Sequence, residues 1–326
     1  MSREHLAWMD LIKGIGMCLV ILGHMSVPEI FGKFIFSFHM PLFFFVSGYL
    51  AHDMGWGRFL MSKADHLVVP YCVYAVPFAL IAIGGGYGAQ WVWMNLAKGN
   101  GVYTTWFLSA LFCSSVLGFV CIKFLKKDWQ ILAVSMLVAV AGVCLPWFGR
   151  HHFMSSHAWC PGTCFFLLGF LFAKRKLTSV FANGGWRVKV AIFTLFVVMG
   201  MSYLFNIRVS MAECKFGNPF LYYISAIGMI GMLFFVCSSY GGRIKVLEYM
   251  GNRSLLFMLW HAVIPTLVMI GFSRVGLDIN DNSAIKAIAR LLNLGLMCLI
   301  VWVIDRYAPL LAGKAYVFRL RKECRK

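Results

Sequence analysis

Three ionisable residues near the N-terminus, Asp10, Lys13 and His24, have the types and spacing that acid–base chemistry needs. At about 100° per residue, a helix leaves an angular offset of about 20° between Lys13 and His24 and about 40° between Asp10 and His24. The three side chains would therefore project from one stripe, with Lys13 about 16 Å from His24 along the axis. Ionisable groups inside an apolar helix are costly, and by default they mark functional sites.

Two interpretations of this stripe fit the periodicity equally well. In the structural one, Asp10 and Lys13 form an i,i+3 ion pair near the lipid headgroups, and His24 hydrogen-bonds to a neighbouring helix. In the functional one, Lys13 attracts an anionic ligand, and His24, whose ordinary pKa lies near neutrality, moves a proton. In both, the stripe must face protein or water rather than lipid.

Two more histidines lie in apolar segments beside prolines. His39 is two residues before Pro41, and His261 is four residues before Pro265. A proline lacks the backbone N–H and disturbs a helix, and irregular backbone at membrane depth is tolerated where it lines a cavity. A single histidine of this kind more often makes a packing hydrogen bond. Trp106 stands at the start of another apolar segment, where an interfacial aromatic residue is common.

The composition identifies the elements that must hold these residues. The chain has 326 residues, of which 61% are hydrophobic and 13% charged, whereas soluble chains average about 45–50% and about 25%. This excludes a soluble enzyme and a disordered tail. The 30 Lys and Arg against 12 Asp and Glu occur in short runs between apolar stretches, so we expect membrane lipids rather than nucleic acid as partners.

A membrane-spanning helix needs about 20 apolar residues, and ten segments qualify. We therefore predict an all-α integral membrane protein with about ten transmembrane helices in a single membrane domain, residues 1–326. The segments lie near residues 7–27, 34–51, 67–85, 103–122, 129–148, 157–173, 188–206, 219–239, 254–272 and 287–305.

The positive charges predict the orientation of these helices. With ten spans, the termini and the even-numbered loops hold 21 Lys and Arg, and the odd-numbered loops hold 7. Because cations are enriched in cytoplasmic loops, we expect both termini in the cytoplasm. The basic tail, residues 306–326, would also contact anionic lipid headgroups.

The 11 cysteines lie mostly in apolar runs and include no pair at zinc or redox spacing. We interpret them as small hydrophobic residues, and we expect no metal.

Several motifs resemble those of the membrane-bound acyltransferase 3 family. The run from Trp8 to His24 resembles the family's first helix, whose signature is Arg or Lys, ten residues and then His; Lys13 and His24 match it. The run from Ser37 to Tyr49 resembles the second helix, closest to the fucose 4-O-acetylase-like branch. Two later stretches resemble further motifs in the same order, so the resemblance covers nearly the whole chain. They are residues 105–108 and 251–261.

One position departs from the family pattern. Members often carry Arg-x-x-Arg in the loop before the third helix, ahead of a Pro-Tyr pair. Here the matching positions are Lys63 and His66, ahead of Pro70 and Tyr71. One of the two cations is replaced, which weakens the phosphate-binding role that the resemblance implies for this loop.

The resemblance implies transfer of an acetyl group from cytoplasmic acetyl-CoA to a hydroxyl of a cell-surface polysaccharide or its lipid-linked precursor, on either face of a bacterial inner membrane. His24 would be the general base or form a transient acetyl-histidine, Lys13 would attract the donor, and Asp10 would hold Lys13. The alternative is a transporter or flippase of a lipid-linked or anionic solute that uses the stripe as a proton relay. Further substrate-binding candidates are His39, Ser47, Lys63, His66, Trp106 and His261.

Overall fold

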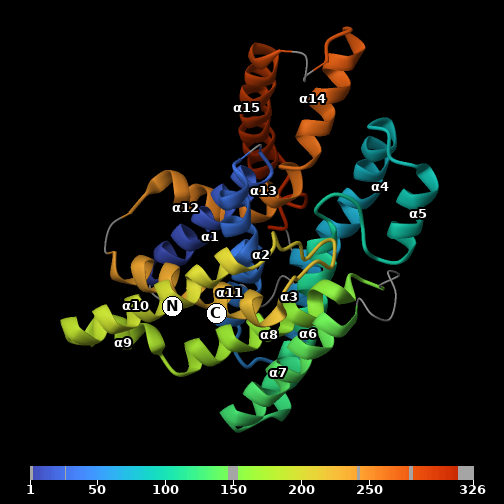
Figure 1. The fold of residues 1–326 in the computed structure, drawn as a ribbon. Helices are drawn as coiled ribbons and strands as arrows, with labels where there is room; N and C mark the ends of the chain where they lie inside the picture. Colours follow the sequence, from blue (N-terminus) through green and yellow to red (C-terminus); the bar gives the residue numbers. More distant parts are fainter. Residues whose placement is uncertain (1–2, 26, 146–152, 241–242, 279–281, 315–326) are drawn as a thin grey trace. The chain divides into compact units, whose positions relative to one another are not determined.

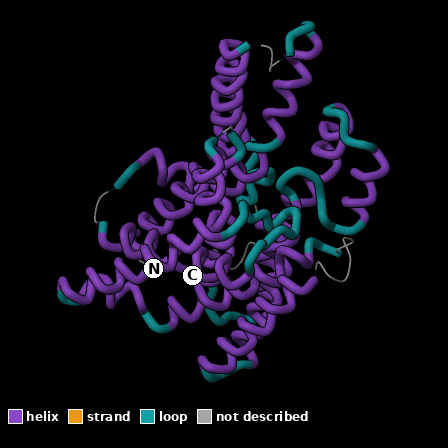
Figure 2. Tube along the Cα trace, in the orientation of Figure 1, coloured by secondary structure: helices purple, strands orange, loops and turns teal. Residues whose placement is uncertain are grey.

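The structure is a computed structural model that describes residues 3–25, 27–145, 153–240, 243–278 and 282–314. Over this part of the chain the regular structure is helical, with no strand, as Figure 2 shows. The all-α prediction is therefore confirmed. Most of the predicted basic tail, residues 315–326, lies outside the described residues.

Each of the ten predicted segments coincides with helical structure (Figure 1). Among the described residues, eight helical segments are long and apolar enough to cross a membrane, so the chain is a multi-pass integral membrane protein. The other two predicted segments are α1 (Arg3–Gly23) and the shorter apolar helix α7 (Asp128–Cys144). The eight are α2 (Glu29–Tyr49), α3 to α4 (Trp56–Gly84), α6 (Trp106–Phe124), α8 (Ser156–Lys174), α10 with a 3-10 turn (Trp186–Phe205), α11 (Pro219–Ser239), α13 to α14 (Ser254–Arg274) and α15 (Ser283–Tyr307).

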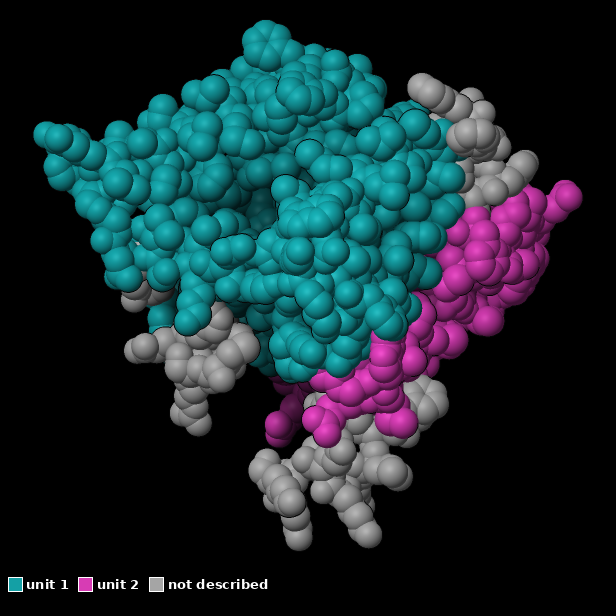
Figure 3. Space-filling model, turned by 90° about the horizontal axis from the view of Figure 1, so that it is seen from below, with its two compact units in different colours: residues 1–53, 113–151, 156–254 teal, residues 54–112, 152–155, 255–326 magenta. Residues whose placement is uncertain are grey.

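The chain divides into two compact units, which Figure 3 colours separately. Unit 1 comprises residues 1–53, 113–151 and 156–254, and unit 2 comprises residues 54–112, 152–155 and 255–326. Each unit therefore combines segments from distant parts of the sequence. Short helices connect or cap the long ones within the units: α5 (Ala89–Ala97), α9 (Leu177–Asn183) and α12 (Lys245–Asn252).

Unit 1 is built around α2, which packs against α1, α8 and α11. Phe234 of α11 is fully buried and is the centre of an aromatic cluster. Its ring centroid lies 5.7 Å from Trp8, 5.4 Å from Tyr49, 5.0 Å from Phe45 and 5.5 Å from Phe172. One side chain thus connects four helices through edge-to-face contacts, which stabilise aromatic pairs beyond simple burial.

Glycines allow two helix pairs of unit 1 to touch at the backbone. A Cβ at Gly48 of α2 would lie 1.8 Å from the Phe166 carbonyl oxygen of α8, and one at Gly169 of α8 would lie 2.1 Å from the Phe45 oxygen. Likewise, a Cβ at Gly251 of α12 would lie 1.8 Å from the Asp10 oxygen of α1. Small residues of this kind are what membrane helices use to approach closely.

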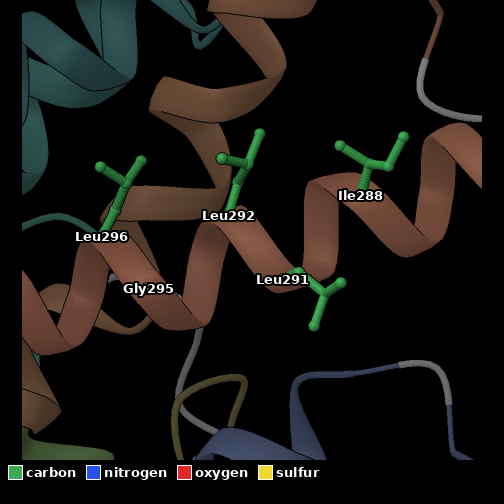
Figure 4. Close-up of a pocket in the computed structure, with 5 residues that line it drawn as sticks. All are labelled: Ile288, Leu291, Leu292, Gly295 and Leu296. Atoms are coloured by element: carbon green, nitrogen blue, oxygen red, sulfur yellow. The ribbon is translucent and has the colours of Figure 1, made fainter.

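Unit 2 contains α4 (Val69–Gly84), which packs against α5 and α14 (Val263–Arg274), and α14 packs against α15. A π-helical turn, η1 (Ala64–Val68), joins α3 (Trp56–Lys63) to α4. Pockets among the described residues include a shallow apolar hollow of about 370 Å³ along one face of α15 (Figure 4). Its lining carries no polar side chain, so it offers no chemistry. The lining residues are Ile288, Leu291, Leu292, Gly295 and Leu296.

Candidate active site

The charged part of the α1 stripe is an ion pair. Lys13 Nζ lies 2.6 Å from Asp10 Oδ1, and the two side chains are 22% and 23% exposed. α12 packs across this part of α1, with Cys18 Sγ 3.6 Å from Met250 Sδ. The ion pair is therefore half-buried against the protein rather than fully solvated. Both interpretations of the stripe are compatible with this ion pair.

α1 and α2 run antiparallel, which separates the candidates of unit 1 into two groups. Trp8, near the start of α1, has its ring 5.8 Å from that of Tyr49 at the end of α2. At the other end, the His24 ring lies 5.6 Å from that of Phe36. Ser47, half-buried, therefore lies toward the Asp10–Lys13 end of the pair.

His24 is the first residue after α1, which ends at Gly23 rather than near residue 27. The chain leaves the helix here because Pro28, at the N-cap of α2, restricts the short connection between α1 and α2. The His24 side chain is exposed, and the residue lies just outside the helix rather than within it. Its Nδ1 lies 3.0 Å from the Val20 carbonyl oxygen.

Phe36 organises a cluster of polar groups around His24. The buried His39 ring lies 4.8 Å from the Phe36 ring, and the Arg208 guanidinium lies 4.1 Å from its centroid. Arg208 also donates an Nη2 hydrogen bond to the Gly23 carbonyl oxygen at 3.2 Å. Two histidines and an arginine from three segments thus surround one aromatic ring.

Each of the four candidate histidines directs Nδ1 at a carbonyl of its own segment. The acceptors are Val20 for His24 (3.0 Å), Ile35 for His39 (2.8 Å), Ser62 for His66 (2.7 Å) and Met258 for His261 (2.9 Å). In a neutral imidazole this contact places the hydrogen on Nδ1 and makes Nε2 the proton acceptor. His39 and His261 are buried, His66 is half-buried, and His24 alone of the four is exposed.

In unit 2, the structure brings the motif before α6 next to the break between α13 and α14. Thr104 Oγ1 donates to the Leu259 carbonyl oxygen at 3.3 Å, two residues before His261. The helix is interrupted between Trp260 and Val263, where Pro265 cannot donate to the His261 carbonyl. Trp106 is half-buried as the first residue of α6.

Lys63 and His66 stand on either side of the α3–η1 boundary in unit 2. Lys63 is the last residue of α3, and its Nζ lies 5.9 Å from the Phe59 ring centroid. His66 is inside the π-helical turn η1, and the buried Asp65 precedes it. Such wide turns often occur at functional sites, and this one coincides with the departure from the family's Arg-x-x-Arg pattern.

Arg208 was not predicted as a site residue, because in the sequence it is only one of the seven Lys and Arg residues of the odd-numbered loops. No local motif marks this residue. The small number of cations in the odd-numbered loops was the one feature of the sequence that could have pointed to it.

Among the described residues, no group of three or more His, Cys, Asp or Glu side chains is arranged to hold a metal ion.

Comparisons with known proteins identify the family of this chain. A family model described as "Acyltransferase domain" (Acyl_transf_3) matches residues 6–304. The nodulation protein NolL of Sinorhizobium fredii (strain NBRC 101917 / NGR234) is 28% identical over 184 residues, which are 51% of this chain and 48% of that protein, so the chain spans about half the length of this relative. No solved structure matches. The family match covers the Lys13–His24 stripe and every other candidate residue, and the chain therefore belongs to the acyltransferase 3 family of membrane acyltransferases.

Proposed function

We propose that this acyltransferase moves an acetyl group from cytoplasmic acetyl-CoA to a hydroxyl of a polysaccharide or its lipid-linked precursor, in the bacterial inner membrane. The observation that carries the proposal is the exposed His24, whose Nδ1 contact with Val20 makes Nε2 the proton acceptor. His24 is exposed at the end of α1, which distinguishes it from the buried His39 and His261.

The reaction balances with one base. His24 Nε2 takes the proton of the acceptor hydroxyl while the oxygen bonds to the thioester carbonyl carbon. The carbon–sulfur bond then breaks, and the departing coenzyme A sulfur takes the proton from the imidazolium. In a variant of this path, His24 Nε2 first bonds to the thioester carbonyl carbon, the carbon–sulfur bond breaks, and coenzyme A leaves with the imidazolium proton. The acceptor oxygen then bonds to the acetyl carbon and displaces the imidazole, which takes the hydroxyl proton.

The donor binds, in this proposal, from the side on which Asp10 and Lys13 lie. Coenzyme A is an anion, and the Lys13 ammonium is a half-buried cation whose position the Asp10 carboxylate holds at 2.6 Å. Removal of Lys13 should therefore weaken coenzyme A binding. Lys33 is the matched control, because it pairs with Glu29 one turn away on α2 at 3.7 Å and lies 25% exposed.

The test uses purified protein, radiolabelled acetyl-CoA and a membrane extract as the source of acceptor. His24→Ala should lower transfer by about 10²–10⁴-fold, the usual contribution of a general base, whereas the exposed His52→Ala should leave it unchanged. A fully active His24→Ala variant overturns the mechanism. Unchanged coenzyme A affinity in Lys13→Ala, relative to Lys33→Ala, removes Lys13 from the donor site.

A further inference from the structure

The loop between α10 and α11, which carries Arg208, is held in one conformation by its own hydrogen bonds. Asn206, 7% exposed, lies at its centre. The Asn206 amide nitrogen donates to the carbonyls of Phe216 and Asn218, each at 3.2 Å, and its oxygen accepts from the backbone N–H groups of Ile207 and Asn218, each at 2.9 Å. This one buried side chain therefore closes the loop on itself two residues before Arg208.

Further contacts anchor the same loop. Val209 is 1% and Met211 4% exposed, so the residues after Arg208 are fixed in the core of unit 1. Gly217 has φ +64°, and a Cβ there would lie 2.2 Å from the Asn206 Oδ1. The loop thus requires glycine at this position, because any larger residue would displace the asparagine.

The Arg208 side chain is exposed but held in place. Its guanidinium lies on the Phe36 ring, donates one hydrogen bond to the Gly23 carbonyl, and lies beside Gly32, where an added Cβ would be in ordinary van der Waals contact with Nη1 at 3.5 Å. A guanidinium has five N–H donors. Among the described residues, one of these donors is used in the hydrogen bond to Gly23. The guanidinium therefore keeps parallel N–H donors beside His24.

No acidic side chain of the described part of the chain neutralises Arg208. The acidic residue that follows it in the loop, Glu213, pairs with Lys215 at 2.6 Å, and Glu29 at the start of α2 pairs with Lys33 at 3.7 Å. A positive charge with unused, fixed donors is suited to carboxylate or phosphate, which accept two parallel hydrogen bonds from arginine.

We infer that Arg208, with Gly32 and Phe36 as its wall, binds an anionic group of the acceptor, a sugar carboxylate or a sugar phosphate, and thereby places the acceptor hydroxyl at His24. The inference rests on the proposed function, because it takes His24 as the base. It assigns Arg208 to specificity and positioning: the residue selects acidic over neutral acceptors.

The experiment measures binding, so that it does not depend on turnover. The purified protein, in nanodiscs of zwitterionic phosphatidylcholine, is titrated with glucose, glucuronate, glucose 1-phosphate and inorganic phosphate by saturation-transfer NMR. Wild type should bind one of the two acidic sugars at least about 10-fold more tightly than glucose, consistent with charge-assisted hydrogen bonds. The sugar with the higher affinity distinguishes carboxylate from phosphate, and the phosphate titration shows whether the sugar ring contributes.

Arg208→Gln should reduce this preference to within about twofold, and Arg208→Lys, which keeps the charge but loses the fork, should retain only part of it. The control is Arg187→Gln, since Arg187 also lies on an aromatic ring, 5.6 Å from the Trp186 centroid. It should keep the full preference. Arg208→Lys still decides the question if Arg208→Gln does not fold.

Equal binding of acidic and neutral sugars by wild type, or an unchanged preference in the folded Arg208 variants, overturns the inference. Failure of the proposed function is a separate result: His24→Ala would retain acetyl transfer, whatever the anion preference. A purely structural role for Arg208, as a cap on the last carbonyls of α1, predicts lower thermal stability in Arg208→Gln with no change in the ratio of affinities.

Discussion

Replacing Gly48 by alanine tests whether α2 and α8 touch at the backbone. The added Cβ would lie 1.8 Å from the carbonyl oxygen, 2.6 Å from the carbonyl carbon and 2.8 Å from the Cα of Phe166. All three atoms belong to the backbone, so no change of rotamer relieves the overlap. To bring the 1.8 Å approach to an ordinary contact of about 3.4 Å, the helices must separate locally by about 1.6 Å, in an interior that is close-packed.

The expected cost follows from these distances. A gap of about 0.5–1 Å already forfeits a quarter to a half of the dispersion energy of the atoms that line it, and overpacking costs about 1–3 kcal/mol. An overlap this large belongs at the upper end of that range, from which the better helix propensity of alanine recovers about 1 kcal/mol. With an unfolding entropy of about 2.1 cal/mol/K per residue over 326 residues, a net loss of about 2 kcal/mol should lower the melting temperature by about 3 °C.

Thermal unfolding of both variants in one detergent, at one scan rate, is the measurement. The control is Gly295→Ala on α15, where an added Cβ meets nothing within 4 Å and should leave the melting temperature unchanged or slightly higher. If Gly48→Ala melts at or above the wild-type temperature, α2 and α8 do not pack with this contact, and the arrangement around α2 described above is refuted.

Three further predictions concern stability. Phe234→Ala should cost about 3–5 kcal/mol in thermal unfolding, because the buried ring connects four helices; a loss below 1 kcal/mol would contradict the aromatic cluster. Arg243, 2.6 Å from Glu248, holds the pKa of that carboxyl below its ordinary value of 4.5, so the pair stabilises the fold above this pH and the stability is lost as the pH falls through the lowered pKa. The difference in melting temperature between wild type and Glu248→Gln should therefore shrink on acidification. A difference that does not depend on pH would exclude a stabilising ion pair. Gly217→Ala should open the loop that Asn206 closes, seen as faster proteolysis between α10 and α11; a cleavage rate equal to wild type would show that the loop tolerates a Cβ.

The sequence predicted the long helices well because length and apolarity are properties of each segment alone. Within the described residues a helix lies in each of the ten segments, and the Asp10–Lys13 pair lies one turn apart as the spacing requires. The short helices were not predicted, because α5, α9 and α12 have seven to nine residues and lack a long apolar run. Their helicity depends on packing that a single segment does not encode.

The site was predictable only in part for a related reason. Lys13 lies on α1 and His24 directly follows that helix, so an argument from helical periodicity could connect them. Arg208 reaches His24 through Gly23 and Phe36, a contact over 185 residues of sequence that depends on the shape of a loop. The end of α1 was also misplaced, since an apolar run does not show where a following proline forces the chain out of the helix.

The contact between α1 and α12 also determines when the site can be completed during synthesis. Cys18 and Met250 are 232 residues apart, yet their sulfur atoms lie 3.6 Å from each other. A ribosome that adds about 5–20 residues per second needs roughly 10–50 s to reach α12 after it has made α1. During that interval the Asp10–Lys13 helix is without its partner. A chain that stops before α12 would therefore contain Lys13 and His24 but lack the packing of α12 against α1.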